Sequence, residues 1–423
     1  MVASTQWWTR IRTRARIRGL SLWLRITGSR AARSHVLLIA PTNPGSMGDE
    51  AMLQAATHVL RDAGATVDIG SAFSGRSWDG IEGARRSVDL RKATHDLDSL
   101  LRIFAGYEHV LLIGADVMDG YYSEDRSLWR ARLVHAAARV ARHAALVGFS
   151  WSDPATPGTI SAVRRMGRRV ELWSRDPVSR QRLMRVVDQP VGLSADLAFL
   201  LEPRDPAGTV ASDVEWIRSR RSRGPVVGIN LARTAFLELM DEGLTPDSLV
   251  ERFASETRAI LDARPTASVL IIPHDWRTET SDVALGEQLR STVLAGDPGL
   301  GGRLRLVAPD PPSAAALKLV AGMASVVVSS RMHLAIAALG SGTPAATLAY
   351  QGKTEGLFQH VPGLGDWSID PSEALMPGTI ASWVGRLLER ETELRATIDA
   401  ALPTVRQLAT RNLPLPAVQR REP

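Results

Sequence analysis

Residues 325–356 read SVVVSSRMHLAIAALGSGTPAATLAYQGKTEG, and they predict a strand that leads directly into a helix. The β-branched run at 326–328 is typical of a buried strand. Ser329 and Ser330 follow at positions where a helix N-cap is expected, and the glycine-containing segment 340–342 ends the helix. Strands that alternate with helices in this way are typical of parallel α/β sheets.

The first turn of this helix carries two side chains of chemical interest, Arg331 and His333. A helix N-terminus has free N–H groups and about half a positive charge, so it favours an anion. Because histidine titrates near neutrality, the pair predicts a pocket that can hold an anion and move a proton. Plain helix capping, with Arg331 in solvent and His333 satisfied in the core, is the alternative interpretation.

Composition places the 423-residue chain among globular proteins with two or three domains. The hydrophobic content is 44% and the charged content is 23%, as in soluble proteins, and no apolar run reaches the roughly 18 residues that would span a membrane. The absence of cysteine excludes thiol nucleophiles, disulfides and cysteine-based zinc sites. No metal-ligand cluster of recognisable spacing appears, so we expect no metal.

The net charge of +6 is concentrated at the N-terminus. Residues 1–34 contain eight arginines and no acidic residue, together with tryptophan, leucine and isoleucine. Such a segment is expected either to lie on the surface of an anionic membrane or to be a disordered leader. We expect the protein to be cytoplasmic and, in the first case, to lie at the inner face of the plasma membrane. Because the basic charge stays in this segment and no base-stacking motif appears, nucleic acid is not an expected partner.

Two series of alternating strands and helices follow the basic segment. The first occupies 35–201, with a polar loop expected at 71–92, and the second occupies 225–377. A linker rich in proline, arginine, aspartate and serine is expected at 202–224, and helices with a tail at 378–423. We therefore predict an α/β protein with two Rossmann-like domains that face a cleft, where ligands would bind. The C-terminal helices are predicted to pack back across both domains.

The loop PTNPGSMGDE at 41–50, after the first strand, is expected to reach the ligand. It precedes a helix predicted over about 49–63, and it places Asn43, Gly48 and Asp49 at the carboxyl end of the strand, where open α/β sheets bind ligands. The loop contains neither GxGxxG nor GxxxxGK[ST], so it indicates neither a dinucleotide nor a P-loop nucleotide. Helix capping is the simpler alternative for Asp49.

Eight short motifs occur in order along the chain. They are Gly48-Asp49-Glu50, Leu111 to Gly114, Ser174-Arg175-Asp176 with Ser179, Ala195 to Phe199, Gly228-Ile229-Asn230, Pro273-His274-Asp275, Ser330 to His333, and Gly342-Thr343-Pro344 with Tyr350 and 353–356. Each motif alone is weak. Together, in one frame of two α/β domains, they resemble the polysaccharide pyruvyl transferase family over about 35–370.

The resemblance implies a transferase with two Rossmann-like domains arranged as in GT-B glycosyltransferases. It implies phosphoenolpyruvate as donor substrate, no separate cofactor, and a pair of sugar hydroxyls as acceptor, in a cell-surface glycan that is often lipid-linked. The product would be a ketal. One motif departs from the family: after the strand at 109–114 the family usually has a run of glycines, whereas this chain has Ala115-Asp116-Val117. An acidic side chain there would repel an anionic donor or mark a different acceptor.

Candidate site residues follow from the resemblance and from their chemistry. Arginine binds carboxylate and phosphate bidentately, so we expect several arginines around the donor. Ketal formation needs a proton delivered to the enol carbon and a proton removed from a sugar hydroxyl, which requires a general acid–base residue. The catalytic candidates are His333 and His274, the donor-binding candidates are Arg331, Arg175, Arg233, Asn230, Lys353 and Ser330, and the acceptor or cleft candidates are Asn43, Gly48, Asp49, Asp116 and Asp275.

Two of these candidates have simpler interpretations. Arg175 would form an ion pair with the adjacent Asp176 or lie on the surface. His274 would end a strand while Asp275 caps the next turn, although the same two residues would also suit a histidine–carboxylate unit that orients the ring.

Two other functions suit the same fold. A GT-B glycosyltransferase that uses a nucleotide sugar would share the two-domain frame and the anion-binding helix start. A non-catalytic glycan-binding protein would have lost donor binding at Ala115-Asp116. Binding of a nucleotide diphosphate in preference to phosphoenolpyruvate would indicate the first, and glycan binding without donor binding would indicate the second.

Overall fold

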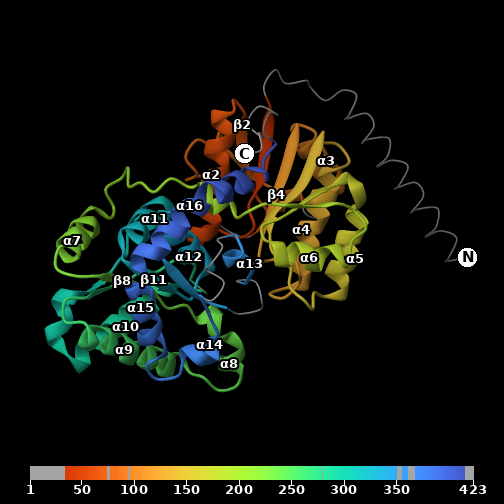
Figure 1. Ribbon diagram of the computed structural model, residues 1–423. Coiled ribbons are helices and arrows are strands. Elements are labelled where there is room, and N and C mark those ends of the chain that lie inside the picture. The colour runs from red at the N-terminus through yellow and green to blue at the C-terminus, as the bar shows by residue number, and fades with distance from the viewer. Residues whose placement is uncertain are drawn as a thin grey trace, which may run out of the picture.

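The computed structural model describes residues 34–73, 77–93, 96–278, 280–349, 355–360 and 367–414. The basic segment at 1–33 and the candidate Lys353 lie outside these ranges. The described chain forms two α/β domains, each with one parallel sheet at its centre (Figure 1). This architecture confirms the predicted fold class of two Rossmann-like domains with helices at the C-terminus.

The first sheet is formed by β1 (His35–Ile39), β2 (Thr66–Ser71), β3 (Ser87–Asp89), β4 (His109–Ala115), β5 (His143–Phe149), β6 (Glu171–Ser174) and β7 (Val191–Leu193). The strands are parallel, in the order β3-β2-β1-β4-β5-β6-β7. The central strands are fully buried aliphatic runs, as expected of a sheet covered on both faces. Strand β3 lies inside the segment predicted as a polar loop, because three residues are too few for a recognisable period.

Helices cover both faces of this sheet: α2 (Met47–Asp62), α3 (Leu97–Phe104), α4 (Glu124–Ala137), α5 (Pro157–Met166), α6 (Pro177–Met184) and the 3-10 helix η3 (Leu197–Leu200). Helix α2 begins before the predicted residue, because the Ser46 hydroxyl caps it by accepting from the Asp49 N–H. Asp49 is therefore a residue of the first turn and is not the cap.

The second sheet is formed by β8 (Val226–Asn230), β9 (Ser268–Ile271), β10 (Leu304–Leu306), β11 (Val326–Ser329), β12 (Ala345–Leu348) and β13 (Ser368–Ile369). Its strands are also parallel, in the order β10-β9-β8-β11-β12-β13. Residues 325–356 thus supply the central strand β11 and its neighbour β12.

The helices of the second half are α7 (Ala211–Arg221), η4 (Arg233–Phe236), α8 (Leu237–Asp241), α9 (Pro246–Ala263), α10 (Asp282–Gly296), α11 (Ala314–Met323), α12 (Met332–Leu339), α13 (Glu355–Phe358), α14 (Pro371–Ala374), α15 (Thr379–Glu389) and α16 (Glu391–Thr410). Helix α7 lies in the segment expected as a linker. Among the described helices, none is both long enough and apolar enough to cross a bilayer.

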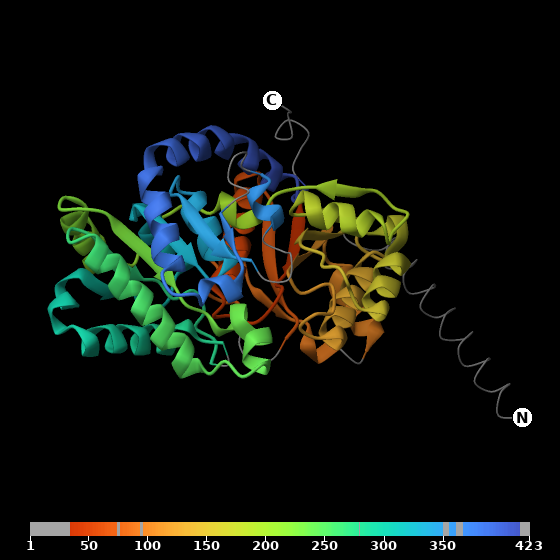
Figure 2. The same ribbon diagram turned by 60° about the horizontal axis from the view of Figure 1, so that its bottom comes forward.

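The C-terminal helix α16 connects the two domains, as predicted from its sequence (Figures 1 and 2). Near its start, Arg395 donates hydrogen bonds to the carbonyl oxygens of Gly342 and Ala324 in the second domain. Just past its end, the Asn412 side chain donates to the Ala195 carbonyl and accepts from the Gly148 N–H in the first domain. The helix therefore holds both domains through specific polar contacts at its two ends.

The carboxyl edges of the two sheets face each other, and their loops are joined by backbone hydrogen bonds. The Met47 N–H donates to the His274 carbonyl at 3.3 Å, and the Trp276 N–H donates to the Gly45 carbonyl at 2.8 Å. One buried apolar cluster also extends from α2 of the first domain to α11 and α12 of the second. The structure therefore holds the domains in a closed arrangement.

Candidate active site

A cavity of about 590 Å³ lies between the two domains. From the first domain the loops after β1 and β4 line it, and from the second domain the loops after β8, β9 and β11 do so. Strand order reverses at β1 and at β8, which is where open α/β sheets bind ligands. The cavity wall contains the predicted site residues Gly48, Asp49, Asp116, Arg233, His274, Arg331 and His333.

The cavity has a strong excess of basic side chains. The arginines in its wall come from both domains, and the carboxylates in its wall are Asp49 and Asp116. Such a surface concentrates anions, because field lines are focused in a cleft with low-dielectric walls. The arginines are Arg126, Arg130, Arg233, Arg277 and Arg331.

His333 from the second domain lies beside a carboxylate of the first domain. Its Nε2 is 3.5 Å from Oδ2 of Asp196, which follows β7. Burial alone would raise the pKa of Asp196, but His333 and Arg175 outweigh it and hold that pKa below its usual range. The ionised carboxylate of the first domain therefore faces the His333 ring of the second domain.

Arg175 forms an ion pair with the same carboxylate. Its Nη1 lies 2.8 Å from Oδ2 of Asp196, and its Nε donates to the Ser150 hydroxyl at 2.8 Å. The side chain is almost fully buried, with 3% of its surface exposed. The suggested ion pair with Asp176 is therefore wrong, because Arg175 pairs with Asp196, while direct contact of Arg175 with the donor stays a prediction.

Gly48 fixes the position of the His333 ring. A β-carbon at residue 48 would lie 2.4 Å from Cγ and Nδ1 of His333, so only glycine leaves room for the imidazole. Helix α2 of the first domain thus packs its first turn directly against the ring. Gly48, a predicted cleft residue, contributes by close packing.

The helix that carries His333 begins one residue later than predicted. Its N-cap is Arg331 in an extended conformation, not Ser329 or Ser330, and no side chain caps it. The Ser329 hydroxyl accepts from the Arg331 N–H, whereas the Ser330 hydroxyl donates to the Asn230 carbonyl. Ser330 is 1% exposed and does not belong to the cavity wall, so donor binding by it stays a prediction.

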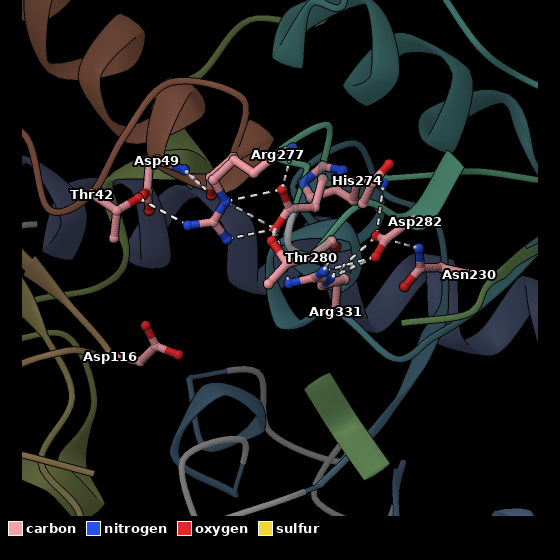
Figure 3. Close-up of polar contacts among 12 residues, drawn as sticks. Thr42, Asp49, Asp116, Asn230, His274, Arg277, Thr280, Asp282 and Arg331 are labelled. Atoms are coloured by element: carbon pink, nitrogen blue, oxygen red, sulfur yellow. Dashed lines mark hydrogen bonds and ion pairs between the residues drawn. The ribbon is translucent and has the colours of Figure 1, made fainter. Parts of the chain in front are cut away.

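Arg331 and Arg277 are held by buried carboxylates in the network drawn in Figure 3. Arg331 lies 2.7 Å from Asp282 and 3.2 Å from Asp275, and Arg277 also forms an ion pair with Asp275. Arg277 further donates from Nη1 to the Thr42 hydroxyl of the first domain at 3.2 Å. The network orients both guanidinium groups while partly neutralising them.

His274 is not oriented by its neighbour in sequence. The Asp275 carboxylate binds Arg277, Arg331 and the Thr280 hydroxyl, so the suggested histidine–carboxylate unit is wrong. Among the described residues, neither ring nitrogen of His274 has a hydrogen-bond partner. Burial, with smaller contributions from the positive charges of His333 and Arg331, holds the pKa of His274 well below 6.5. The ring is therefore neutral near pH 7.

The first-domain candidates differ in their surroundings. Asp49 contacts the Thr42 hydroxyl, and burial raises the pKa of its carboxyl group. Asp116 accepts a hydrogen bond from the Tyr122 hydroxyl at 3.1 Å and lies apart from the arginine network in Figure 3. Asn43 is in the loop after β1 but is not part of the cavity wall.

The departure at Ala115-Asp116 has a local structural effect. Ala115 has a φ of +47°, and it is the non-glycine residue with positive φ in the described chain. A left-handed conformation is easiest for glycine, which accounts for the glycines that the family usually has here. The backbone therefore turns at this point although a side chain is present, and Asp116 is placed in the cavity wall.

The donor-binding candidates Asn230 and Arg233 differ in how deeply they are buried. Asn230, 1% exposed, lies behind the wall, where its amide donates to the Ile272 carbonyl and to Asp282. Arg233 is exposed in η4 at the edge of the cavity. Donor binding by either residue stays a prediction.

Sequence reasoning missed Arg130 of α4. It is 3% exposed, and its Nε and Nη2 donate to the Pro41 carbonyl at 3.0 and 2.6 Å. Burial lowers its pKa to about 10, so it remains charged at neutral pH. In the described part of the chain, no carboxylate forms an ion pair with it. One arginine among so many gave no signal, because burial of Arg130 is a tertiary property.

The fold is the two-domain, GT-B-like arrangement of two parallel α/β sheets. A putative UDP-N-acetylglucosamine 2-epimerase from Listeria monocytogenes is 14% identical with a TM-score of 0.60, over 90% of this chain and 95% of that chain. A UDP-GlcNAc 2-epimerase from Neisseria meningitidis is 11% identical with a TM-score of 0.57, over 89% and 98%. A glycosyltransferase from Rickettsia africae is 11% identical with a TM-score of 0.56, over 90% and 96%. At these identities the likeness shows the fold alone.

The sequence places the chain more narrowly. The polysaccharide pyruvyl transferase family profile matches residues 47–352, and the chain belongs to this family. The matched range contains every residue of the cavity wall except Thr42 and Ser46. No curated protein matches the chain by sequence.

Proposed function

We propose that the protein transfers the pyruvyl group of phosphoenolpyruvate to two hydroxyls of a sugar in a cell-surface glycan. The observation that carries the proposal is the arginine-rich cavity between the domains, with His333 in its wall and the buried Asp196 beside His333. Family membership supports the same chemistry. The products would be a pyruvyl ketal and inorganic phosphate.

The charges of the cavity support phosphoenolpyruvate as the donor. This molecule carries a carboxylate and a phosphate, and arginine pairs with both groups in a bidentate manner. Arg277 and Arg331 already have carboxylate partners. Arg126, Arg130 and Arg233 form no ion pair among the described residues, so no carboxylate neutralises their charge, although Nε and Nη2 of Arg130 also donate to the Pro41 carbonyl. These three arginines are therefore the best suited to attract the donor.

The proposed reaction begins at the methylene carbon of the donor. Protonated His333 delivers a proton to this carbon, which makes C2 electrophilic, and the first sugar hydroxyl oxygen bonds to C2. The bond between C2 and the phosphate oxygen then breaks, and the second hydroxyl oxygen bonds to C2. His274 accepts the proton of one hydroxyl and passes it to the departing phosphate, and the proton of the other hydroxyl replaces the one that His333 gave. General acid–base assistance of this kind is worth roughly 10²–10⁴-fold.

The two histidines of the site suit opposite roles. His333 lines the cavity and its Nε2 lies 3.5 Å from the Asp196 carboxylate, so we assign it the role of the acid. His274 is held neutral by burial and has unbonded ring nitrogens among the described residues, so it is the candidate base for a sugar hydroxyl. Different environments that separate the protonation states of two similar groups are typical of acid–base sites.

We test the proposal with purified protein, phosphoenolpyruvate and a panel of glycan acceptors. Phosphate release and the mass of the glycan are measured for the wild type, for His333→Ala and for the control His135→Ala, which changes a histidine of α4 outside the cavity. We expect His333→Ala to lose at least about 100-fold in rate. Turnover by His333→Ala close to that of the wild type would reject the assignment.

A thermal-shift comparison separates the proposal from a nucleotide-sugar glycosyltransferase. A specific ligand raises the melting temperature by mass action. We expect phosphoenolpyruvate to stabilise the wild type, and an Arg130→Gln variant to respond less. Stabilisation by nucleotide sugars, with none by phosphoenolpyruvate, would favour the glycosyltransferase.

We also propose that the basic segment at 1–34 keeps the enzyme at the inner face of the plasma membrane, near a lipid-linked acceptor. Its arginines and tryptophans support contact with anionic lipid. Sedimentation with anionic liposomes should decrease when residues 1–34 are deleted. Unchanged sedimentation would exclude this role.

A further inference from the structure

Two adjacent tyrosines project from the loop between β4 and α4. Tyr121 and Tyr122 are 42% and 41% exposed, which makes them unusual among the large hydrophobic side chains of the described chain. Their rings are nearly perpendicular, at 87°, with centroids 5.1 Å apart. Each ring therefore presents a face in a different direction.

The two rings belong to different hollows. Tyr122 lines the main cavity, whereas Tyr121 lines a smaller hollow of about 170 Å³. Thr234 and Leu237 line both hollows, so the smaller one adjoins the main cavity. A molecule longer than the donor could thus extend from the cavity onto the Tyr121 ring.

The smaller hollow has the opposite charge to the main cavity. Its ionisable side chains are Glu238, Glu242 and Asp370, and no arginine lines it. Asp370 caps helix α14 by accepting from the Ser372 N–H, so the carboxylates suited to a ligand are those of Glu238 and Glu242. Phosphoenolpyruvate would be repelled here, because both the donor and the wall are negative.

The side chains of the smaller hollow match a neutral sugar. The face of a sugar ring is lined with C–H groups, which pack on an aromatic face, and a tyrosine adds a polar hydroxyl at the edge. Carboxylates accept hydrogen bonds from neighbouring sugar hydroxyls. The Tyr121 hydroxyl already donates to Oε1 of Glu238 at 3.1 Å, so the ring of one domain is oriented by a carboxylate of the other.

We propose that the smaller hollow is a second sugar subsite, which binds the unit next to the sugar that receives the pyruvyl group. The inference rests on the proposed function for the identity of the first sugar. It specifies the acceptor as a neutral oligosaccharide of at least two units, with the second unit on Tyr121 and its hydroxyls on Glu238 and Glu242. Uronic acids are disfavoured at this second position, because their carboxylates would face two glutamates.

The test compares binding of two sets of probes by saturation-transfer NMR and calorimetry. One set is methyl glycosides of neutral hexoses, and the other is neutral disaccharides that end in the same hexoses. Proteins are the wild type, Tyr121→Ala, Tyr121→Phe and the control Met184→Ala, which removes another exposed apolar side chain, 51% exposed on α6. Thermal unfolding of each variant checks the fold.

We expect at least one disaccharide to bind the wild type more tightly than its monosaccharide. Tyr121→Ala should weaken that disaccharide by roughly 3- to 10-fold, the usual contribution of an aromatic contact, and leave the monosaccharide unchanged. Tyr121→Phe keeps the ring and should lose less, and Met184→Ala should lose nothing. The subsite is rejected when no disaccharide gains over its monosaccharide, or when the gain persists in Tyr121→Ala.

Failure of the proposed function would look different. Binding of the probes needs neither phosphoenolpyruvate nor turnover. Disaccharide binding that depends on Tyr121, without phosphate release from phosphoenolpyruvate, would support the subsite and reject the transfer chemistry. Phosphate release from phosphoenolpyruvate, with no effect of Tyr121→Ala on the binding of any disaccharide, would support the transfer chemistry and reject the subsite.

Discussion

Replacing Gly48 by alanine tests whether the position of the His333 ring determines activity. In the structure a β-carbon at residue 48 would lie 2.4 Å from Cγ and Nδ1 of His333 and 2.8 Å from its Cβ. Ordinary contacts of a β-carbon are 3.4–4 Å. The imidazole must therefore retreat by about 1 Å, which moves Nε2 relative to Asp196 and to the donor.

The expected effects on stability and on rate are of different size. Alanine is favoured over glycine inside a helix by about 1 kcal/mol, and overpacking typically costs about 1–3 kcal/mol, so the free energy of unfolding should change by less than about 2 kcal/mol. A catalytic group displaced by about 1 Å costs on the order of 10²-fold in rate. Gly48→Ala should therefore fold normally and lose most of its activity.

The assay combines urea unfolding with initial rates of phosphate release from phosphoenolpyruvate. Gly80→Ala is the control, because a β-carbon there meets no atom within 4 Å. The double variant Gly48→Ala/His333→Ala shows whether Gly48 acts through the histidine, since its rate should equal that of His333→Ala alone. A folded Gly48→Ala protein with near wild-type turnover, or a double variant much slower than His333→Ala, would refute the reasoning.

Three further predictions concern contacts between or beside the domains. Asp196→Asn leaves the buried Arg175 without a carboxylate, so we expect a loss of about 3–5 kcal/mol in urea unfolding together with a lower rate of phosphate release. Burial raises the pKa of Glu50 from 4.5 in the unfolded state to about 7 in the folded state. The folded state therefore favours the protonated carboxyl group. This stabilisation of the fold is complete below pH 4.5 and is lost as the pH rises to 7. Unfolding curves between those pH values should show a fall of about 2–4 kcal/mol in the wild type relative to Glu50→Gln. Asn412→Ala removes the hydrogen bonds that anchor the end of α16 to the first domain, and should lower the unfolding free energy by about 2–4 kcal/mol without changing donor affinity.

The fold was predictable from the sequence because its strands carry a strong local signal. The apolar runs that became β1, β4, β8 and β11 are buried on both faces, so their hydrophobicity is nearly continuous. Strand β3, with three partly buried residues, has no such signal and was predicted as loop. Its pairing with β2 depends on the neighbouring strand and not on its own residues.

The site residues were predictable only where a motif directly follows a predicted strand. His333, Arg331 and His274 each follow a strand of the second sheet, and all three line the cavity. Their partners were not predictable, because partners are chosen by tertiary packing. The sequence suggested Asp275 for His274, whereas the folded chain uses Asp275 to hold two arginines.

The contact between Asp196 and His333 was not predictable from sequence either, although the position of Asp196 after a strand was visible there. The residue lies in one of the motifs and follows a strand directly, but no residue near it in sequence indicates a contact with His333, which lies in the other domain. An aspartate at the carboxyl end of a parallel strand is a candidate site residue from its position alone, because ligands bind at that end of the sheet. The two exposed tyrosines after β4 had no comparable signal in sequence, since exposure is a property of the folded chain.

The proposed acid is assembled from both domains. Helix α12 of the second domain supplies His333, while the first domain supplies Asp196, whose carboxylate faces the ring, and Gly48, which leaves room for it. Opening of the domains would therefore remove the carboxylate from the imidazole, and it would also admit water to an electrophilic C2 atom, which water would convert to pyruvate. The backbone hydrogen bonds between 45–47 and 274–276 hold this arrangement closed. In the proposed pyruvyl transfer, the division of the His333 environment between two domains would couple formation of the acid to closure of the cavity, which would limit hydrolysis.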